Sequence, residues 1–146
     1  MAAAVVLKEF RTNLRLITFE ATCMATIPMD FLENKMFSEK HRSSKAQLFH
    51  DVTQFLYEFT KHEESNPELY TGLNSCDSVC MACLIDPSMI KETKSIYAVV
   101  EPYGNLHGGH MVSDWYNHFK RQANVEIISD IDRDKFLEIF RLCVKE

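Results

Sequence analysis

Apolar residues recur at helical spacing between residues 45 and 61, and this pattern constrains the fold more than any other part of the sequence. They occupy positions i, i+4, i+7, i+8 and i+11: Leu48, Val52, Phe55, Leu56 and Phe59. Residues with this spacing share one face of an α-helix. Ser44 precedes Gln47 by three residues, the spacing of a capping box at a helix start. The sequence therefore predicts an amphipathic helix that buries this apolar face.

Shorter apolar runs predict the other elements of the chain. Residues 14–27 favour an extended segment, because β-branched and large apolar side chains are mixed with polar ones. Pro28 ends this segment, since proline has no amide donor. Residues 78–85 and 95–100 favour two neighbouring strands joined by a loose hairpin. A helix with apolar residues at 112–119 and its C-terminal end at Asn124 is predicted to follow, then a strand at 125–129 and a last helix at 132–144.

The predicted order is strand, helix, strand, strand, helix, strand, helix. A βαββαβ order is typical of the ferredoxin-like sandwich, in which helices cover one face of an antiparallel sheet. The chain has 146 residues, a common size for one domain. We therefore predict a single α+β domain over residues 1–146, a ferredoxin-like sandwich with an additional C-terminal helix. Another α+β domain with an antiparallel sheet is the alternative.

Charge and cysteine content limit the class of protein. The net charge of −5 argues against bulk binding to nucleic acid, which needs many cations facing phosphates. No window approaches the ~20 apolar residues of a membrane span, so no membrane partner is expected. The five cysteines are an odd number, and no signal-peptide core precedes them. We expect free thiols, and a soluble protein of the cytoplasm or nucleus.

A loop at residues 103–110 contains three of the four glycines of the chain. It follows a predicted strand and opens a predicted helix, whose unpaired first amides attract anions. Its histidines could add protonatable donors. The loop therefore predicts a site for a small anion or a nucleotide, although a plain strand-to-helix turn explains the same glycines. The residues of this predicted site are Tyr103, Gly104, Asn105, His107, Gly108, Gly109 and His110.

Cys80 and Cys83 could combine with His107 and His110 as four zinc ligands of the usual type. In a strand, however, residues three apart point to opposite faces of the sheet. The two cysteines could then share a metal only if their segment were a turn. We therefore expect no metal and no cofactor, and a zinc-stabilised domain stays as an alternative.

Aromatic residues outnumber what the predicted core needs, and no set of nucleophile, base and metal ligands emerges. Phe49 and Tyr57 fall off the main apolar face of the predicted helix at 45–61. Aromatic residues are enriched in the cores of protein interfaces. We therefore expect a non-catalytic protein-interaction module rather than an enzyme, a subunit or adaptor of a larger intracellular complex, with a homodimer as one form. Its partner would be another protein or a second copy. The alternative is a small-anion or nucleotide-binding domain, which could be an enzyme, using residues 103–110.

Overall fold

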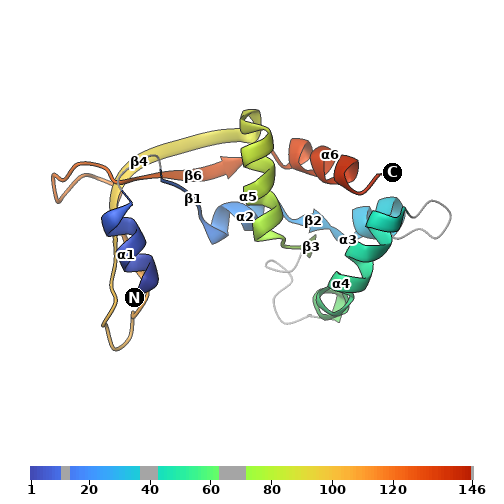
Figure 1. The fold of residues 1–146 in the computed structure, drawn as a ribbon, viewed down its shortest axis with the longest axis horizontal. Helices are drawn as coiled ribbons and strands as arrows, with labels where there is room; N and C mark the ends of the chain where they lie inside the picture. Colours follow the sequence, from blue (N-terminus) through green and yellow to red (C-terminus); the bar gives the residue numbers. More distant parts are fainter. Residues whose placement is uncertain (11–13, 37–42, 63–71, 146) are drawn as a thin grey trace. The chain divides into compact units, whose positions relative to one another are not determined.

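The computed structural model describes residues 1–10, 14–36, 43–62 and 72–145 of the chain. By its contacts the chain divides into two compact units, and each combines segments that are distant in sequence. The first unit is Met1–Thr18 with Glu92–Ser129, and the second is Phe19–Lys91 with Asp130–Glu146. Helices and strands occur in both units (Figure 1), so the predicted mixed class of helix and strand is confirmed.

The first unit holds most of a four-stranded sheet with the strand order β1-β6-β4-β5. Its elements are helix α1 (Ala2–Glu9) and strands β1 (Arg15–Ile17), β4 (Ile90–Val100), β5 (Met111–Asp114) and β6 (Val125–Ile131). β1 pairs in parallel with β6, where Arg15 faces Glu126 and forms an ion pair of 2.5 Å. β4 pairs with β5 in antiparallel orientation. The sheet is therefore mixed, unlike the antiparallel sheet of the predicted ferredoxin-like sandwich.

An apolar core in the first unit joins α1 to the sheet. Its buried members are Leu7, Ile96, Ala98, Val125 and Ile127. Beside this core, the Asn124 side-chain amide donates to the carbonyl oxygens of Leu7 at 3.1 Å and Ala98 at 2.8 Å. Its Oδ1 accepts a hydrogen bond of 2.8 Å from the Ala98 amide. An unsatisfied buried polar group costs about 1–3 kcal/mol, so Asn124 stabilises the packing of α1 on the strands.

Residues 112–119 form the end of β5 and a series of turns, so the predicted helix is wrong here. The buried carboxylate of Asp114 accepts hydrogen bonds from the amides of His118 at 2.7 Å and Phe119 at 2.8 Å. Asn117 and Lys120 have φ angles of 55° and 49°, which a right-handed helix excludes. The apolar spacing of this segment is helical, but the Asp114 carboxylate takes the amides of His118 and Phe119, which a helix would bond to backbone carbonyl oxygens.

The second unit is mainly helical. Its elements are α2 (Phe19–Met24), β2 (Ile27–Pro28), α3 (Met29–Phe31), a π-helical turn (Leu32–Met36), α4 (Ser44–His62), β3 (Gly72–Leu73), α5 (Cys76–Ile85), a 3₁₀ turn (Pro87–Met89) and α6 (Arg133–Cys143). β2 and β3 form a short antiparallel pair, and α5 packs against α2 and α6. Gly72 is required in this pair, because a Cβ there would lie 2.2 Å from the Ile27 carbonyl oxygen. No helix in the described part of the chain is long and apolar enough to cross a membrane.

α5 forms where the apolar run predicts a strand, so the predicted hairpin between this segment and β4 is also wrong. Val79, Ala82 and Cys83 are buried at positions i, i+3 and i+4, the spacing of one helix face. Periodicity alone does not distinguish a short buried strand from a short buried helix. The β-branched residues that favour a strand are few in α5, namely Val79 and Ile85.

α4 confirms the predicted helix, but its buried face is not the predicted one. Phe55, which belongs to the predicted buried face, is 79% exposed, whereas Tyr57 is only 8% exposed. Phe49 packs edge to face against Phe140, with ring centroids 5.1 Å apart. Phe49 and Tyr57, the residues predicted to form an interface, therefore lie on the side of α4 that packs within its own unit.

The sequence of α4 contains two helical stripes, which explains this inversion. The stripe that faces the unit has a spacing of three, four and four residues: Ala46, Phe49, Thr53 and Tyr57. The exposed stripe is longer and more aliphatic, yet periodicity does not tell which stripe meets the core. The helix begins at Ser44, and its cap is Ser43, one residue before the predicted cap, since the Ser43 hydroxyl accepts a hydrogen bond of 3.0 Å from the Ala46 amide.

Candidate functional site

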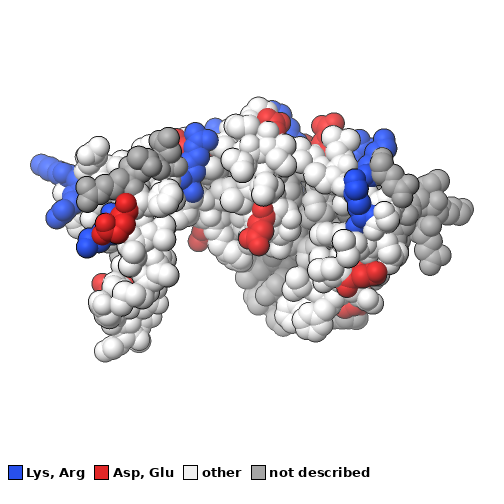
Figure 2. Space-filling view, in the orientation of Figure 1, with Lys and Arg blue, Asp and Glu red and all other residues white. Residues whose placement is uncertain are grey.

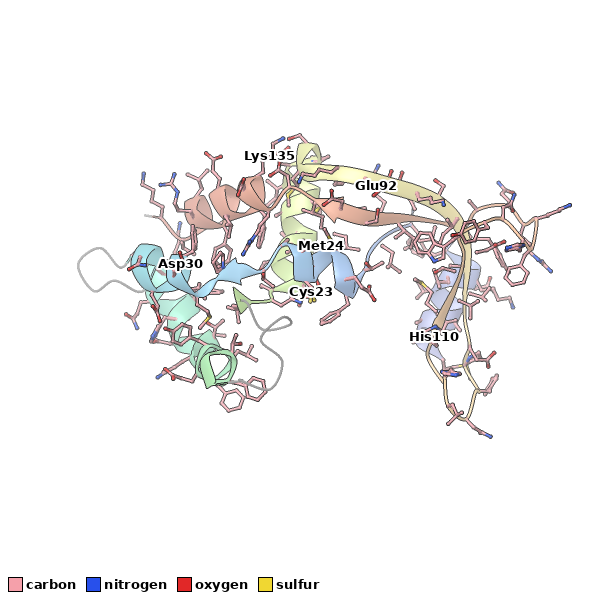
Figure 3. The ribbon with its side chains drawn as sticks, turned by 180° about the vertical axis from the view of Figure 1, so that it is seen from behind. Cys23, Met24, Asp30, Glu92, His110 and Lys135 are labelled. Atoms are coloured by element: carbon pink, nitrogen blue, oxygen red, sulfur yellow. The ribbon has the colours of Figure 1, made fainter. Side chains whose placement is uncertain are left out.

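A cluster of polar and sulfur-containing side chains lies within the second unit, between α2 and the start of α5. Thr22 and Cys23 come from α2, whereas Asn74 and Cys76 lie between β3 and the first turn of α5. Figure 3 shows Cys23 beside the start of α5. The side chains of Thr22 and Cys23 contact those of Asn74 and Cys76, which lie 51 to 54 positions away in sequence. The packing of α2 against α5 therefore creates the cluster. We call these four residues the thiol–amide cluster.

The Asn74 side chain connects the members of the thiol–amide cluster. Its Nδ2 donates to Cys23 Sγ at 3.3 Å and lies 3.4 Å from Thr22 Oγ1. Its Oδ1 accepts from Cys76 Sγ at 3.6 Å. Thr22 Oγ1 is 3.3 Å from Cys76 Sγ and donates to the Phe19 carbonyl oxygen at 2.8 Å. One amide therefore holds two thiols and a buried hydroxyl together.

The environment of Cys23 keeps its thiol protonated at neutral pH. Burial raises the pKa of Cys23 above the ordinary value of 9.0. The nearby Cys76 and Glu20 raise this pKa further, whereas the hydrogen bond from Asn74 lowers it. A protonated thiol is a weak donor and a poor nucleophile. The arrangement therefore does not activate Cys23 for covalent chemistry.

One carboxylate, that of Glu20, interacts electrostatically with Cys23 of the thiol–amide cluster. Asp77 follows Cys76 in the first turn of α5, but it lines a groove with residues of α4 and α6. Neutral hydroxyl and amide groups can bind a ligand that carries several hydroxyls, and a neighbouring carboxylate can accept a proton. Within the ranges that the structure describes, no three His, Cys, Asp or Glu side chains are grouped so as to hold a metal ion.

The predicted loop at 103–110 lies in the first unit, on the hairpin that joins β4 to β5. Figure 3 shows His110 on this hairpin. The loop is closed by hydrogen bonds from Gly109 N to Glu101 O (2.7 Å) and from Glu101 N to His110 O (2.9 Å). Gly109 has a φ of +90°, and a Cβ on Gly108 would lie 2.9 Å from a carbonyl oxygen of the loop itself. The glycines thus serve the conformation of the loop.

This loop leads into strand β5, so the argument from the first amides of a following helix is wrong. Gly104 is half-buried, and the other predicted site residues of the loop are exposed: Tyr103, Asn105, His107, Gly108, Gly109 and His110. The His107 and His110 rings have centroids 5.9 Å apart. A role for this loop in ligand binding stays a prediction.

The two halves of the alternative zinc site lie in different units. Cys80 and Cys83 belong to α5 in the second unit, where Cys80 is exposed and Cys83 is buried. His107 and His110 belong to the first unit. The argument against zinc from strand geometry is wrong, because the cysteines are on a helix. The prediction that no metal binds stays a prediction.

Comparison with known proteins identifies the family. A family model described as "inosine-uridine preferring nucleoside hydrolase" matches residues 1–138. The chain belongs to this nucleoside hydrolase family. No curated protein matches its sequence.

Solved structures of nucleoside hydrolases share the fold of the chain. An "Inosine-Guanosine Nucleoside Hydrolase (IG-NH)" aligns with a TM-score of 0.80 and 21% identity, over 98% of this chain and 44% of that one. The "Purine-Preferring Ribonucleoside Hydrolase from Gardnerella vaginalis" aligns with a TM-score of 0.74 and 17% identity, over 98% of this chain and 42% of that one. The chain therefore spans less than half of the length of these hydrolases.

Membership of a nucleoside hydrolase family overturns the predicted non-catalytic adaptor, and with it the expectation that the chain is not part of an enzyme. The prediction rested on the absence of a recognisable catalytic set and on surplus aromatic residues. The structure places several of those aromatic residues in packing contacts, such as Phe49 against Phe140 and Tyr97 against Phe119. The alternative prediction, a ligand-binding domain that could be an enzyme, agrees better with the family.

The sequence analysis did not select Thr22, Cys23, Asn74 or Cys76 as site residues. Thr22 and Cys23 lie in a segment that the pattern predicts to be extended, and Asn74 lies in a polar stretch that the pattern predicts to be a loop. Their proximity depends on a contact between two helices that sequence spacing does not reveal.

Proposed function

We propose that this chain contributes to the hydrolysis of the N-glycosidic bond of a ribonucleoside. The family match over residues 1–138 carries the proposal. In this reaction the bond between C1′ of the ribose and the nitrogen of the base breaks, and a water oxygen bonds to C1′. One proton of the water goes to a protein side chain that acts as general base, and the leaving nitrogen gains a proton. The products are ribose and the free nucleobase.

Within this proposal the thiol–amide cluster binds the hydroxyl-rich ribose. Sulfur is a weak hydrogen-bond partner, so a ligand hydroxyl that replaces the contact between Asn74 Nδ2 and Cys23 Sγ forms a stronger hydrogen bond. Glu20, which interacts electrostatically with Cys23, is the carboxylate that could accept the proton of the attacking water.

The loop 103–110 of the first unit is a separate candidate site, considered by itself, for a nucleobase. Tyr103 and the imidazoles of His107 and His110 are exposed on it. Aromatic rings stack on nucleobases, and such stacking contributes about 1–3 kcal/mol per base. The proposed role of this loop is therefore to bind a nucleobase rather than an anion at a helix start.

Release of ribose from inosine, guanosine and uridine tests the proposal. The assay compares the wild type with Asn74→Leu, and uses the exposed Asn34→Leu in the π-helical turn as the matched control. A hydrogen bond to a bound ligand contributes about 1.5 kcal/mol, and its loss lowers kcat/KM about tenfold. We expect Asn74→Leu to show at least this loss and Asn34→Leu to match the wild type. Absence of ribose release from all three nucleosides would contradict the proposed function.

A further inference from the structure

Cys23 and Cys76 of the thiol–amide cluster contact the same side-chain amide. Asn74 Nδ2 donates to Cys23 Sγ at 3.3 Å, and Asn74 Oδ1 accepts from Cys76 Sγ at 3.6 Å. The nitrogen and oxygen of an amide are only about 2.3 Å apart, by the bond lengths of the group. Cys76 also raises the pKa of Cys23, as a second acidic group close to the first does. Two thiols from α2 and α5 therefore lie near each other within one unit (Figure 3).

Both cysteines are placed where a disulfide can form between the two helices. Cys23 is the second-last residue of α2, and Cys76 is the first residue of α5. Helix ends fray, so the backbone there can adjust until the sulfur atoms bond at about 2.05 Å. Both side chains are half-buried rather than enclosed, so a small oxidant can reach them.

The other cysteines of α5 are less suitable partners for Cys76. Cys80 and Cys83 lie four and seven residues further along the same helix. Residues three or four apart on a helix have Cβ atoms about 5–6 Å apart, whereas a disulfide requires about 3.5–4.5 Å. A disulfide within α5 would therefore distort the helix, and Cys23 on α2 is the favoured partner of Cys76.

We propose that Cys23 and Cys76 form a reversible disulfide by exchange with a disulfide of low molecular weight, so that the thiol–amide cluster is a site of redox modification. The disulfide would replace the two sulfur contacts of Asn74 and would join α2 to α5 covalently. The proposal rests on the contacts of the reduced cluster. It goes beyond the proposed hydrolysis and does not require it.

The exchange takes place in two steps. Cys76 attacks first, because the environment of Cys23 keeps that thiol protonated. The Cys76 thiolate bonds to one sulfur of the small disulfide, whose S–S bond breaks, and the departing thiolate takes up a proton. Cys23 then loses its proton to solvent and attacks Cys76 Sγ, which releases the second small thiol. Two cysteine thiols are thus oxidised to one disulfide, and the small disulfide is reduced to two thiols.

Proximity rather than acidity selects this pair. The second step is intramolecular, so the closeness of the two sulfur atoms compensates for the low acidity of Cys23. The carboxylate of Glu20 acts on Cys23, and no Lys or Arg side chain among the coloured residues lies over the first turns of α5 in the view of Figure 2. A cationic disulfide such as cystamine therefore fits the charge around the cluster.

The test is oxidation of the reduced protein with an equimolar amount of cystamine at about pH 8.5, near the ordinary pKa of a free thiol. The reaction is stopped with acid and the products are identified by mass spectrometry. Trypsin places Cys23 in residues 16–35, and Cys76 with Cys80 and Cys83 in residues 62–91. Fragmentation of the linked peptides shows which cysteine is bonded. The variants are Cys76→Ser and Cys23→Ser, and the matched control is Cys80→Ser, one turn further along α5.

We expect the disulfide between Cys23 and Cys76 to exceed every other intramolecular disulfide at least about tenfold, because disulfides within α5 would be strained. It should form equally in Cys80→Ser and be absent from Cys76→Ser and Cys23→Ser. After removal of cystamine, the oxidised wild type should unfold at a Tm about 4–16 °C higher than the reduced protein. Dithiothreitol should reverse this shift. Circular dichroism checks that each reduced variant is folded.

Three results would overturn the proposal. The first is a main product in which Cys80 is bonded to Cys76 or Cys83. The second is mixed disulfides with cystamine alone, with no bond between two cysteines of the chain. The third is an increase in Tm of the same size in oxidised Cys76→Ser. None of these measurements depends on ribose release, so the redox proposal and the proposed hydrolysis can fail independently of each other.

Discussion

Two phenylalanines of the second unit, each replaced by alanine, test which helix faces are packed. One lies on a buried face and the other on an exposed face. Phe136 of α6 is 1% exposed, whereas Phe55 of α4 is 79% exposed. Truncation of a buried phenylalanine to alanine costs about 3–5 kcal/mol, because apolar contacts are lost and a cavity remains. Phe55 keeps only about a fifth of its surface in contact with protein, so its truncation should cost less than about 1 kcal/mol.

Thermal unfolding followed by circular dichroism measures both costs. For a protein of this size, about 1 kcal/mol corresponds to a shift in Tm of about 2–4 °C. Phe136→Ala should therefore lower Tm by about 6–20 °C, whereas Phe55→Ala should lower it by no more than a few degrees. Both residues belong to the second unit, so the same unfolding transition reports both. An equal loss for the two variants, or a larger one for Phe55→Ala, would refute the assignment of the exposed face.

Two further outcomes follow from the structure. Gly72→Ala places a Cβ 2.2 Å from the Ile27 carbonyl oxygen and should lower the free energy of unfolding, measured in urea, by about 1–3 kcal/mol. Gly109→Ala should lower it less, by about 1 kcal/mol, because the φ of +90° is strained for alanine but no steric clash arises. The opposite ranking would show that the β2–β3 pair can separate without cost. Because burial raises the pKa of Cys23, its thiolate forms only as pH rises past the ordinary value of 9.0, and its alkylation by iodoacetamide should reach half of its maximal rate above that pH. A half-maximal rate at or below pH 9.0, read by mass spectrometry of the Cys23 peptide, would contradict the raised pKa of Cys23.

Several elements of this protein are determined by the sequence itself. The strands predicted at 95–100 and 125–129 lie within β4 and β6, and the helix predicted at 132–144 contains α6. Asp132 accepts a hydrogen bond of 3.1 Å from the Lys135 amide and so begins α6 where the pattern predicts. These features depend on residues within one or two turns of each other, so local pattern is sufficient.

Other features were decided only by tertiary structure. The apolar run that became α5 fits a strand or a helix equally well, and its packing between α2 and α6 selects the helix. α4 carries two apolar stripes, and the neighbours of the helix decide which one is buried. The thiol–amide cluster joins Thr22 and Cys76 across 54 positions of sequence. Periodicity specifies which residues share a face, whereas the burial of that face and the formation of a site depend on elements brought together from distant parts of the chain.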